Sequence, residues 1–176
     1  MAEKKNIKPN DNQSIGVLFV CLGNICRSPA AEGVFASTVE KEGLADAFYV
    51  DSAGTYGGHS GDLPDYRMRQ HASARGYDLT HRARLINSDD FKRFDAIVTM
   101  DESNYRNICR MARTGEERKI LRMADFLVGF DNYDEVPDPY YEGPEGFELV
   151  LDMLEASCER LMNHLLKNYN TKTNAK

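Results

Sequence analysis

The chain has 176 residues, of which 41% are hydrophobic and 28% charged, and its formal net charge is −6. This length is typical of one domain, and the acidic balance argues against a nucleic-acid partner. The apolar runs are too short to span a membrane, and the polar segment 1–14 lacks the apolar stretch of a secretory signal. We therefore expect a cytoplasmic monomer with no membrane partner.

Strand-like and helix-like segments alternate along the chain, between a disordered lead-in (1–14) and a flexible tail (168–176). Apolar runs predict strands at Ile15–Val20, Phe48–Asp51, Ala96–Met100 and Ile120–Met123. Helical spacing predicts helices at Ser28–Glu42, Asp65–Arg75, Ser103–Ala112 and from Pro144 onward, and a helical turn at Ser88–Arg93. The alternation predicts one α/β domain (15–167) of parallel βαβ units, in which ligands bind beyond the carboxyl ends of the strands.

The segment between the first strand and the first helix carries the clearest chemical signal. Cys21 follows the strand, and Arg27, Ser28 and a helix-opening proline come six to eight positions later. Backbone N–H groups at a helix start attract a dianion such as phosphate, and an arginine binds two of its oxygens. The same positive environment favours the thiolate form of Cys21, and the Ser28 hydroxyl can hydrogen-bond that thiolate. Gly23 and Asn24 tolerate the left-handed backbone that such a loop needs.

Phosphoryl transfer to a thiolate also needs an acid that protonates the leaving oxygen. Asp138, which precedes a proline in an acidic loop, is the best candidate, although Asp-Pro is also typical of an ordinary turn. The four cysteines show neither a CxxC pair nor a metal-ligand spacing, so we expect no metal, no cofactor and a reducing compartment. Export without an N-terminal signal is the alternative.

Several motifs together resemble the low-molecular-weight protein tyrosine phosphatases. They stand in that family's order, at Val20–Pro29, Asp51–Thr55, Thr80–Arg84, Asp95–Asn104 and Asp138–Tyr140. The resemblance implies a four-stranded parallel twisted sheet flanked by helices on both faces. It also implies a phosphocysteine intermediate on Cys21 and Asp138 as general acid and then base. Phosphate would be bound by the loop residues Leu22, Gly23, Asn24, Ile25, Cys26, Arg27 and Ser28. Asn24 would hold the shape of this loop with help from Ser52 and His81.

The same resemblance predicts a substrate cleft for tyrosine-phosphorylated proteins. Its expected walls are Leu22, Ile25, Tyr56, His59, Tyr140 and Tyr141. The chain departs from the family at Gly58, where an aromatic residue is common, and this predicts a wider cleft.

Cys26 is expected to capture an oxidised Cys21 as a disulfide and so to protect it; the alternative is a buried thiol that does not react. Three other functions fit the sequence less well. An arsenate reductase needs two further cysteines in relay, and Cys109 and Cys158 lie too far along the chain. A protein-arginine phosphatase commonly has a small polar residue at the position of Ile25. A catalytically silent phosphotyrosine-binding module would not need Cys21, Arg27 and Asp138 together.

Overall fold

A computed structural model describes residues 14–173, and side chains up to Tyr169. The predicted lead-in therefore lies outside the described residues, apart from Ser14. In this part of the chain the backbone forms a four-stranded sheet in the order β2-β1-β3-β4. All neighbouring strands are parallel, as predicted. The strands are β1 (Ile15–Cys21), β2 (Phe48–Gly54), β3 (Ala96–Thr99) and β4 (Ile120–Arg122).

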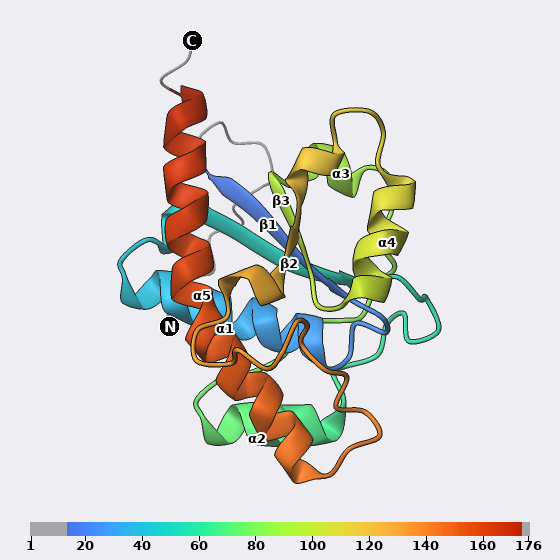
Figure 1. Cartoon of the computed structure of the whole chain (residues 1–176). Helices are drawn as coiled ribbons and strands as arrows, with labels where there is room; N and C mark the ends of the chain where they lie inside the picture. The colour runs from blue at the N-terminus through green and yellow to red at the C-terminus, as the bar shows by residue number, and fades with distance from the viewer. Residues whose placement is uncertain (1–13, 174–176) are drawn as a thin grey trace.

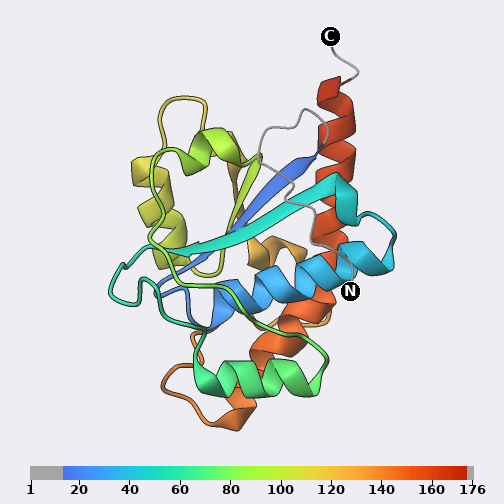
Figure 2. The ribbon, with the colours of Figure 1, turned by 180° about the vertical axis from the view of Figure 1, so that it is seen from behind.

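Helices cover both faces of the twisted sheet (Figures 1 and 2). They are α1 (Arg27–Lys41), α2 (Tyr66–Ala74), α3 (Asp90–Arg93), α4 (Glu102–Met111) and α5 (Pro144–Thr173), with short 3-10 helices η1 (Ala45–Ala47), η2 (Glu117–Lys119) and η3 (Met123–Phe126). Every residue of β1 is buried, because its side chains alternate between two apolar clusters. Val17 and Phe19 join the cluster under α1 and α5, whereas Leu18 and Val20 join the one under α3 and α4. The predicted fold class is thereby confirmed.

The element boundaries differ from the predicted ones in two places that matter. Strand β2 continues past Asp51 to Gly54, because Ser52 and Ala53 pair with β1 and are fully buried. The polar Ser52 interrupted the apolar pattern from which the shorter strand was predicted. Helix α5 continues past Lys167 to Thr173, where a tail was expected, because Tyr169 still packs against the α1–α5 core.

The register of the sheet brings the carboxyl ends of three strands to one edge. Cys21 at the end of β1 pairs with Gly54 of β2, and the preceding Val20 pairs with Thr99 of β3. The chain moves from β1 to β2 on one side and returns to β3 on the other, so this edge is the switch point where open α/β sheets bind ligands. Among residues 14–173, no helix combines the length and the apolar character that crossing a bilayer requires.

Candidate active site

The loop from Cys21 to Arg27 curls around the N-terminus of α1. Asn24 has φ 55°, and it is the one non-glycine residue with positive φ in the described part of the chain. Asparagine accepts this left-handed conformation at low cost, so the loop can turn its backbone N–H groups inward. Helix α1 begins without a side-chain cap at Cys26, which leaves the N–H groups of its first turn available to an anion.

Asn24 holds this loop in place through both ends of its side-chain amide. Its Oδ1 accepts the backbone N–H of Arg84 at 3.0 Å and lies 2.9 Å from His81 Nε2. Its Nδ2 donates to Ser28 Oγ at 2.8 Å and to Ser52 Oγ at 2.9 Å. A buried amide with all of these bonds made fixes the loop before any ligand arrives. Ser52 and His81 therefore lie behind the loop and contact Asn24.

Ser28 connects this support to the thiol. Its Oγ lies 3.0 Å from Cys21 Sγ and 3.4 Å from the carbonyl oxygen of Ala53. Ser28 Oγ accepts from Asn24, and its one proton can go either to the Ala53 carbonyl or to the sulfur. A thiolate is the stronger acceptor of the two, so an ionised Cys21 would draw this proton. Cys21 and Ser28 are both buried, so a thiolate there is stabilised by a hydroxyl donor instead of by water.

Arg27 lies buried beside the thiol, with carboxylates on its outer side. One guanidinium nitrogen donates to Asp101 Oδ2 at 2.6 Å and to the Val136 carbonyl at 3.2 Å. The other lies 3.2 Å from Asp138 Oδ2. Burial acts to lower the pKa of Arg27, but the Cys21 thiolate and the hydrogen bond to Asp101 outweigh it and raise that pKa. The guanidinium is thus held charged and oriented.

Asp101 is a site residue that the sequence analysis did not assign. Its Oδ1 caps α4 by accepting the backbone N–H of Asn104 at 2.8 Å, and its other oxygen holds Arg27. Asp101 also stands just before the predicted helix Ser103–Ala112, and the cap that it forms there is an ordinary role for an acidic residue at that position. Its position directly after β3 was the available signal, because the carboxyl ends of β1 and β3 meet at one edge.

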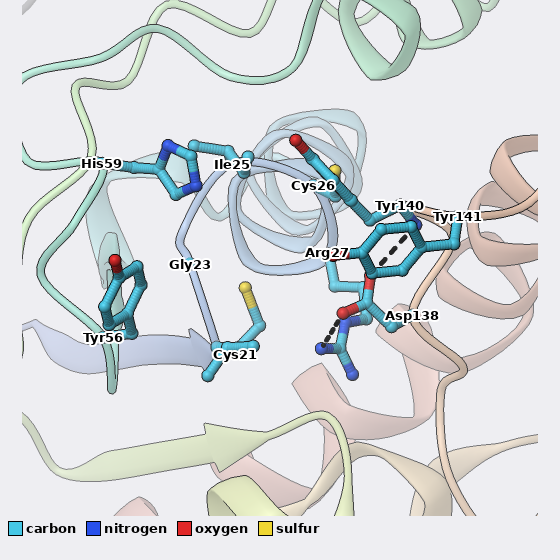
Figure 3. A pocket seen from close by; sticks show the side chains of 11 residues that line it. Cys21, Gly23, Ile25, Cys26, Arg27, Tyr56, His59, Asp138, Tyr140 and Tyr141 are labelled. Atoms are coloured by element: carbon cyan, nitrogen blue, oxygen red, sulfur yellow. Dashed lines mark hydrogen bonds and ion pairs between the residues drawn. The ribbon is translucent and has the colours of Figure 1, made fainter.

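A cavity of about 230 Å³ opens above the thiol. It is lined by Cys21, Leu22, Gly23, Ile25, Cys26, Arg27, Tyr56, His59, Asp138, Tyr140 and Tyr141. Figure 3 shows the Cys21 sulfur directed into this space, with Asp138 beside Arg27 at one wall and Tyr56 at the opposite wall. All six residues predicted to form the cleft line the cavity. Asn24, Ser28, Ser52 and His81 do not line it.

Gly58 does not widen the cleft in the way that we expected from the sequence. A Cβ atom built on Gly58 would lie 2.3 Å from the ring of Tyr56. The Tyr56 ring therefore occupies the space that a side chain at position 58 would take. His59 packs over the loop from Cys21 to Arg27, next to Gly23, and its Nδ1 lies 3.2 Å from Asp62 Oδ2. Tyr56 thus keeps an aromatic wall in the cleft.

The remaining cysteines have different surroundings. Cys26 lines the cavity but is buried, and burial raises the pKa of its thiol. Cys158 is fully buried in α5, and burial raises its pKa as well. Cys109 is half-buried on α4. Arsenate reduction would need disulfide exchange between Cys21 and further cysteines. Cys158 is buried in the core and is not accessible for such exchange, which argues against this activity.

Fold and pocket together define an α/β protein with a thiol and an arginine in an anion-binding loop, the arrangement of a phosphatase. The family model for low molecular weight phosphotyrosine protein phosphatase matches residues 16–171. The chain therefore belongs to this family of protein-tyrosine-phosphatases, as the resemblance indicated.

Individual relatives cover most of the chain. A low molecular weight protein-tyrosine-phosphatase of Streptomyces coelicolor is 43% identical over 83% of this chain and 90% of its own. The crystal structure of a protein tyrosine phosphatase from Entamoeba histolytica matches with a TM-score of 0.85 and 43% identity, covering 88% of this chain and 99% of that one. A Drosophila arginine phosphatase matches with a TM-score of 0.78 and 37% identity, covering 84% and 96%.

Proposed function

We propose that this protein hydrolyses phosphotyrosine in proteins through a phosphocysteine intermediate on Cys21. The observation that carries the proposal is the position of the Cys21 sulfur, 3.0 Å from the Ser28 hydroxyl under a cavity that Arg27 and Asp138 also line. A phosphate bound in this cavity would contact the Cys21 thiolate, the Arg27 guanidinium and the Asp138 carboxyl group. A thiol nucleophile also has to stay reduced, which fits the cytoplasmic setting proposed from the sequence.

The first half of the reaction forms the S–P bond. The Cys21 thiolate attacks phosphorus while Arg27 and the loop N–H groups bind the equatorial oxygens. As the bond from phosphorus to the phenolic oxygen breaks, Asp138 gives its proton to that oxygen, and tyrosine leaves neutral. When phosphate binds, Arg27 gives up its contact with Asp138 and binds phosphate oxygens instead. The Asp138 carboxyl group is then free to lie beside the leaving oxygen.

The second half regenerates the enzyme. Asp138, now a carboxylate, takes a proton from a water molecule as the oxygen of that water attacks phosphorus. The S–P bond breaks, inorganic phosphate is released, and the electron pair returns to Cys21. Ser28 donates its hydrogen bond to the returning thiolate, which makes the sulfur a better leaving group. No step calls for a metal ion.

We expect phosphotyrosine to be preferred over phosphoarginine because of Ile25, the apolar residue within the loop. Its side chain lines the cavity, and it offers no hydrogen-bond acceptor to a guanidinium that it would desolvate. The Drosophila arginine phosphatase shares the fold, so this discrimination has to come from the cavity wall. Tyr56 and Tyr140 supply aromatic walls for a phenyl ring.

Ile25→Thr should raise the ratio of kcat/KM for phosphoarginine to kcat/KM for phosphotyrosine by roughly tenfold or more, because a hydroxyl acceptor replaces the ethyl group of isoleucine. The measurement is kcat/KM on matched peptides that differ only in the phosphorylated residue. Ile25→Val, which keeps the wall apolar, is the control and should leave the ratio near that of the parent. A parent enzyme that prefers phosphoarginine would overturn the proposed substrate class but not the thiolate mechanism.

Reversible oxidation is the regulatory part of the proposal. Peroxide converts the Cys21 thiolate to a sulfenic acid and releases hydroxide. Cys26 lines the same cavity as a protonated thiol and would condense with that sulfenic acid, forming a disulfide and water. A dithiol then reduces the disulfide and restores activity.

Cys26→Ser should therefore reduce the fraction of activity that dithiothreitol restores after a peroxide pulse, because unprotected sulfenic acid goes on to irreversible sulfinic acid. Activity is measured before the pulse, after it, and after reduction. Cys109→Ser, on α4, serves as the control and should recover like the parent. Equal recovery in Cys26→Ser and the parent would reject the protective role.

A further inference from the structure

Helix α2 carries an arginine, Arg67, that contacts the loop of Asp138 without lining the cavity above Cys21. Its guanidinium carbon lies 5.2 Å from the centre of the Tyr140 ring and 4.8 Å from the centre of the Phe147 ring. Both spacings are within the range of about 6 Å over which a cation is attracted to an aromatic face. Phe147 is in the first turn of α5, so one cation joins α2 to this turn and to the loop before it.

The direction of the Arg67 side chain is fixed by Asp65. Asp65 Oδ1 accepts from Arg67 Nε at 3.0 Å, and Oδ2 accepts from Nη2 at 2.9 Å. Burial acts to raise the pKa of Asp65, but the hydrogen bonds from Arg67 outweigh it and lower that pKa. The same pairing raises the pKa of Arg67, so both groups stay charged. A guanidinium held by two parallel bonds keeps one plane and one orientation.

Asp65 is itself attached to the loop from Cys21 to Arg27. Its backbone N–H donates to the carbonyl oxygen of Ile25 at 2.7 Å. Its side chain also caps α2 by accepting the backbone N–H of Arg67 at 2.9 Å. Helix α2 packs against α5, as Figure 1 shows. Arg67 is therefore held in a fixed position relative to the loop that we propose binds phosphate.

The other partner of Arg67, Tyr140, is bonded directly to Asp138. The Tyr140 backbone N–H donates to Asp138 Oδ1 at 3.1 Å, and Asp138 Oδ2 lies 3.2 Å from Arg27. Figure 3 shows Asp138 and Tyr140 at the same wall of the cavity. The next residue, Tyr141, is 93% exposed and gives this part of the loop little support. The Asp138 carboxyl group is thus held by Arg27 on one side and by Tyr140 on the other.

These two holds differ once substrate is bound. In the proposed reaction, Arg27 gives up its contact with Asp138 and binds phosphate oxygens. The contacts of Tyr140 remain, from its N–H to Asp138 and from its ring to Arg67. A general acid has to lie about 2.6–3.2 Å from the oxygen that it protonates, and small misplacements are costly. The proton transfer therefore depends on how firmly the ring of Tyr140 is held.

We propose that Arg67 is a positioning residue for the general acid: it holds the ring of Tyr140 and thereby keeps the Asp138 carboxyl group beside the leaving oxygen. This inference rests on the proposed function, because it needs Asp138 as the acid. Arg67 itself touches neither the thiol nor the bound phosphate. Its loss should therefore slow the protonation of the leaving group and leave phosphate binding unchanged.

The test is kcat and KM of Arg67→Met across a series of substituted phenyl phosphates, with Asp138→Asn measured beside it. On poor leaving groups we expect kcat to fall by roughly tenfold, because two cation–π contacts are lost and the acid is less well placed. On good leaving groups kcat and KM should stay within about twofold of the parent, since these need no proton. Arg67→Lys keeps a cation near the rings and should restore part of kcat. In a Tyr140→Leu background, Arg67→Met should cause little further loss.

Arg69→Met is the matched control, because Arg69 is on the same helix but lies over Tyr66 and binds the Pro64 carbonyl. It should behave like the parent on every substrate. Parental kinetics of Arg67→Met, a loss equal on all leaving groups, or the same graded loss in Arg69→Met would overturn the role of Arg67. A graded loss in Asp138→Asn beside parental Arg67→Met would overturn this inference alone, whereas no graded loss in Asp138→Asn would overturn the proposed acid as well. If Arg67→Met does not fold, Arg67→Lys decides the question, with a graded loss of about threefold expected.

Discussion

Cys21→Ser is expected to lower kcat by on the order of 10⁴- to 10⁶-fold, a loss typical of removing a catalytic nucleophile. A serine hydroxyl stays protonated near neutral pH, and the contacts that stabilise a thiolate do not ionise it. Affinity for inorganic phosphate should change little, because the loop N–H groups and Arg27 remain. The variant should therefore bind substrates without turning them over.

Turnover is measured with an aryl phosphate, and phosphate binding by calorimetry. Acid quenching of the parent during turnover of a radiolabelled substrate should trap phosphate on the protein, and Cys21→Ser should trap none. Cys109→Ser, which changes a cysteine outside the cavity, should keep parental kcat. Turnover by Cys21→Ser within tenfold of the parent would exclude the phosphocysteine mechanism. Chelator-sensitive turnover of the parent would exclude a metal-independent one.

The loop from Cys21 to Arg27 was predictable as a candidate site because its residues are close together in the sequence. Cys21, Arg27 and Ser28 lie within eight residues, and a strand end followed by a helix start fixes their direction. Asn24 likewise sits where the backbone has to turn left-handed. The parallel sheet followed from the alternation of apolar runs and helical spacing, since that alternation leaves few topologies.

Contacts between segments that are far apart in the chain could not be predicted from the sequence. Arg27 binds Asp101 and Asp138, which lie 74 and 111 residues further along the chain. Only the resemblance to a family favoured Asp138 as an acid over an ordinary turn residue. The position of Asp101 before a predicted helix is sufficiently explained by helix capping. Nothing in a one-dimensional pattern says which capping carboxylate will also face an arginine.

A second limit on prediction from the sequence is that one side chain can fill the space expected for another. Gly58 predicted a wider cleft, but the ring of the neighbouring Tyr56 fills that space.

Asp138→Asn is expected to lower kcat by about 10²–10⁴-fold on phenyl phosphates with poor leaving groups, because it removes the general acid. The asparagine amide keeps the size of the side chain but has no proton to transfer to a phenolate. With good leaving groups, whose phenolates are stable without a proton, the loss should be much smaller. The dependence of kcat on the leaving group's acidity should therefore become steeper in the variant.

The measurement is kcat across a series of substituted phenyl phosphates, for the parent and for Asp138→Asn. Asp134→Asn is the matched control, since it removes a carboxylate from the same acidic loop without touching the cavity. Because Asp138 also lies beside Arg27, its loss could alter phosphate binding, and that effect would fall on all substrates alike. A uniform loss across the series would assign Asp138 to orienting Arg27, whereas a loss graded with the leaving group assigns it to proton transfer.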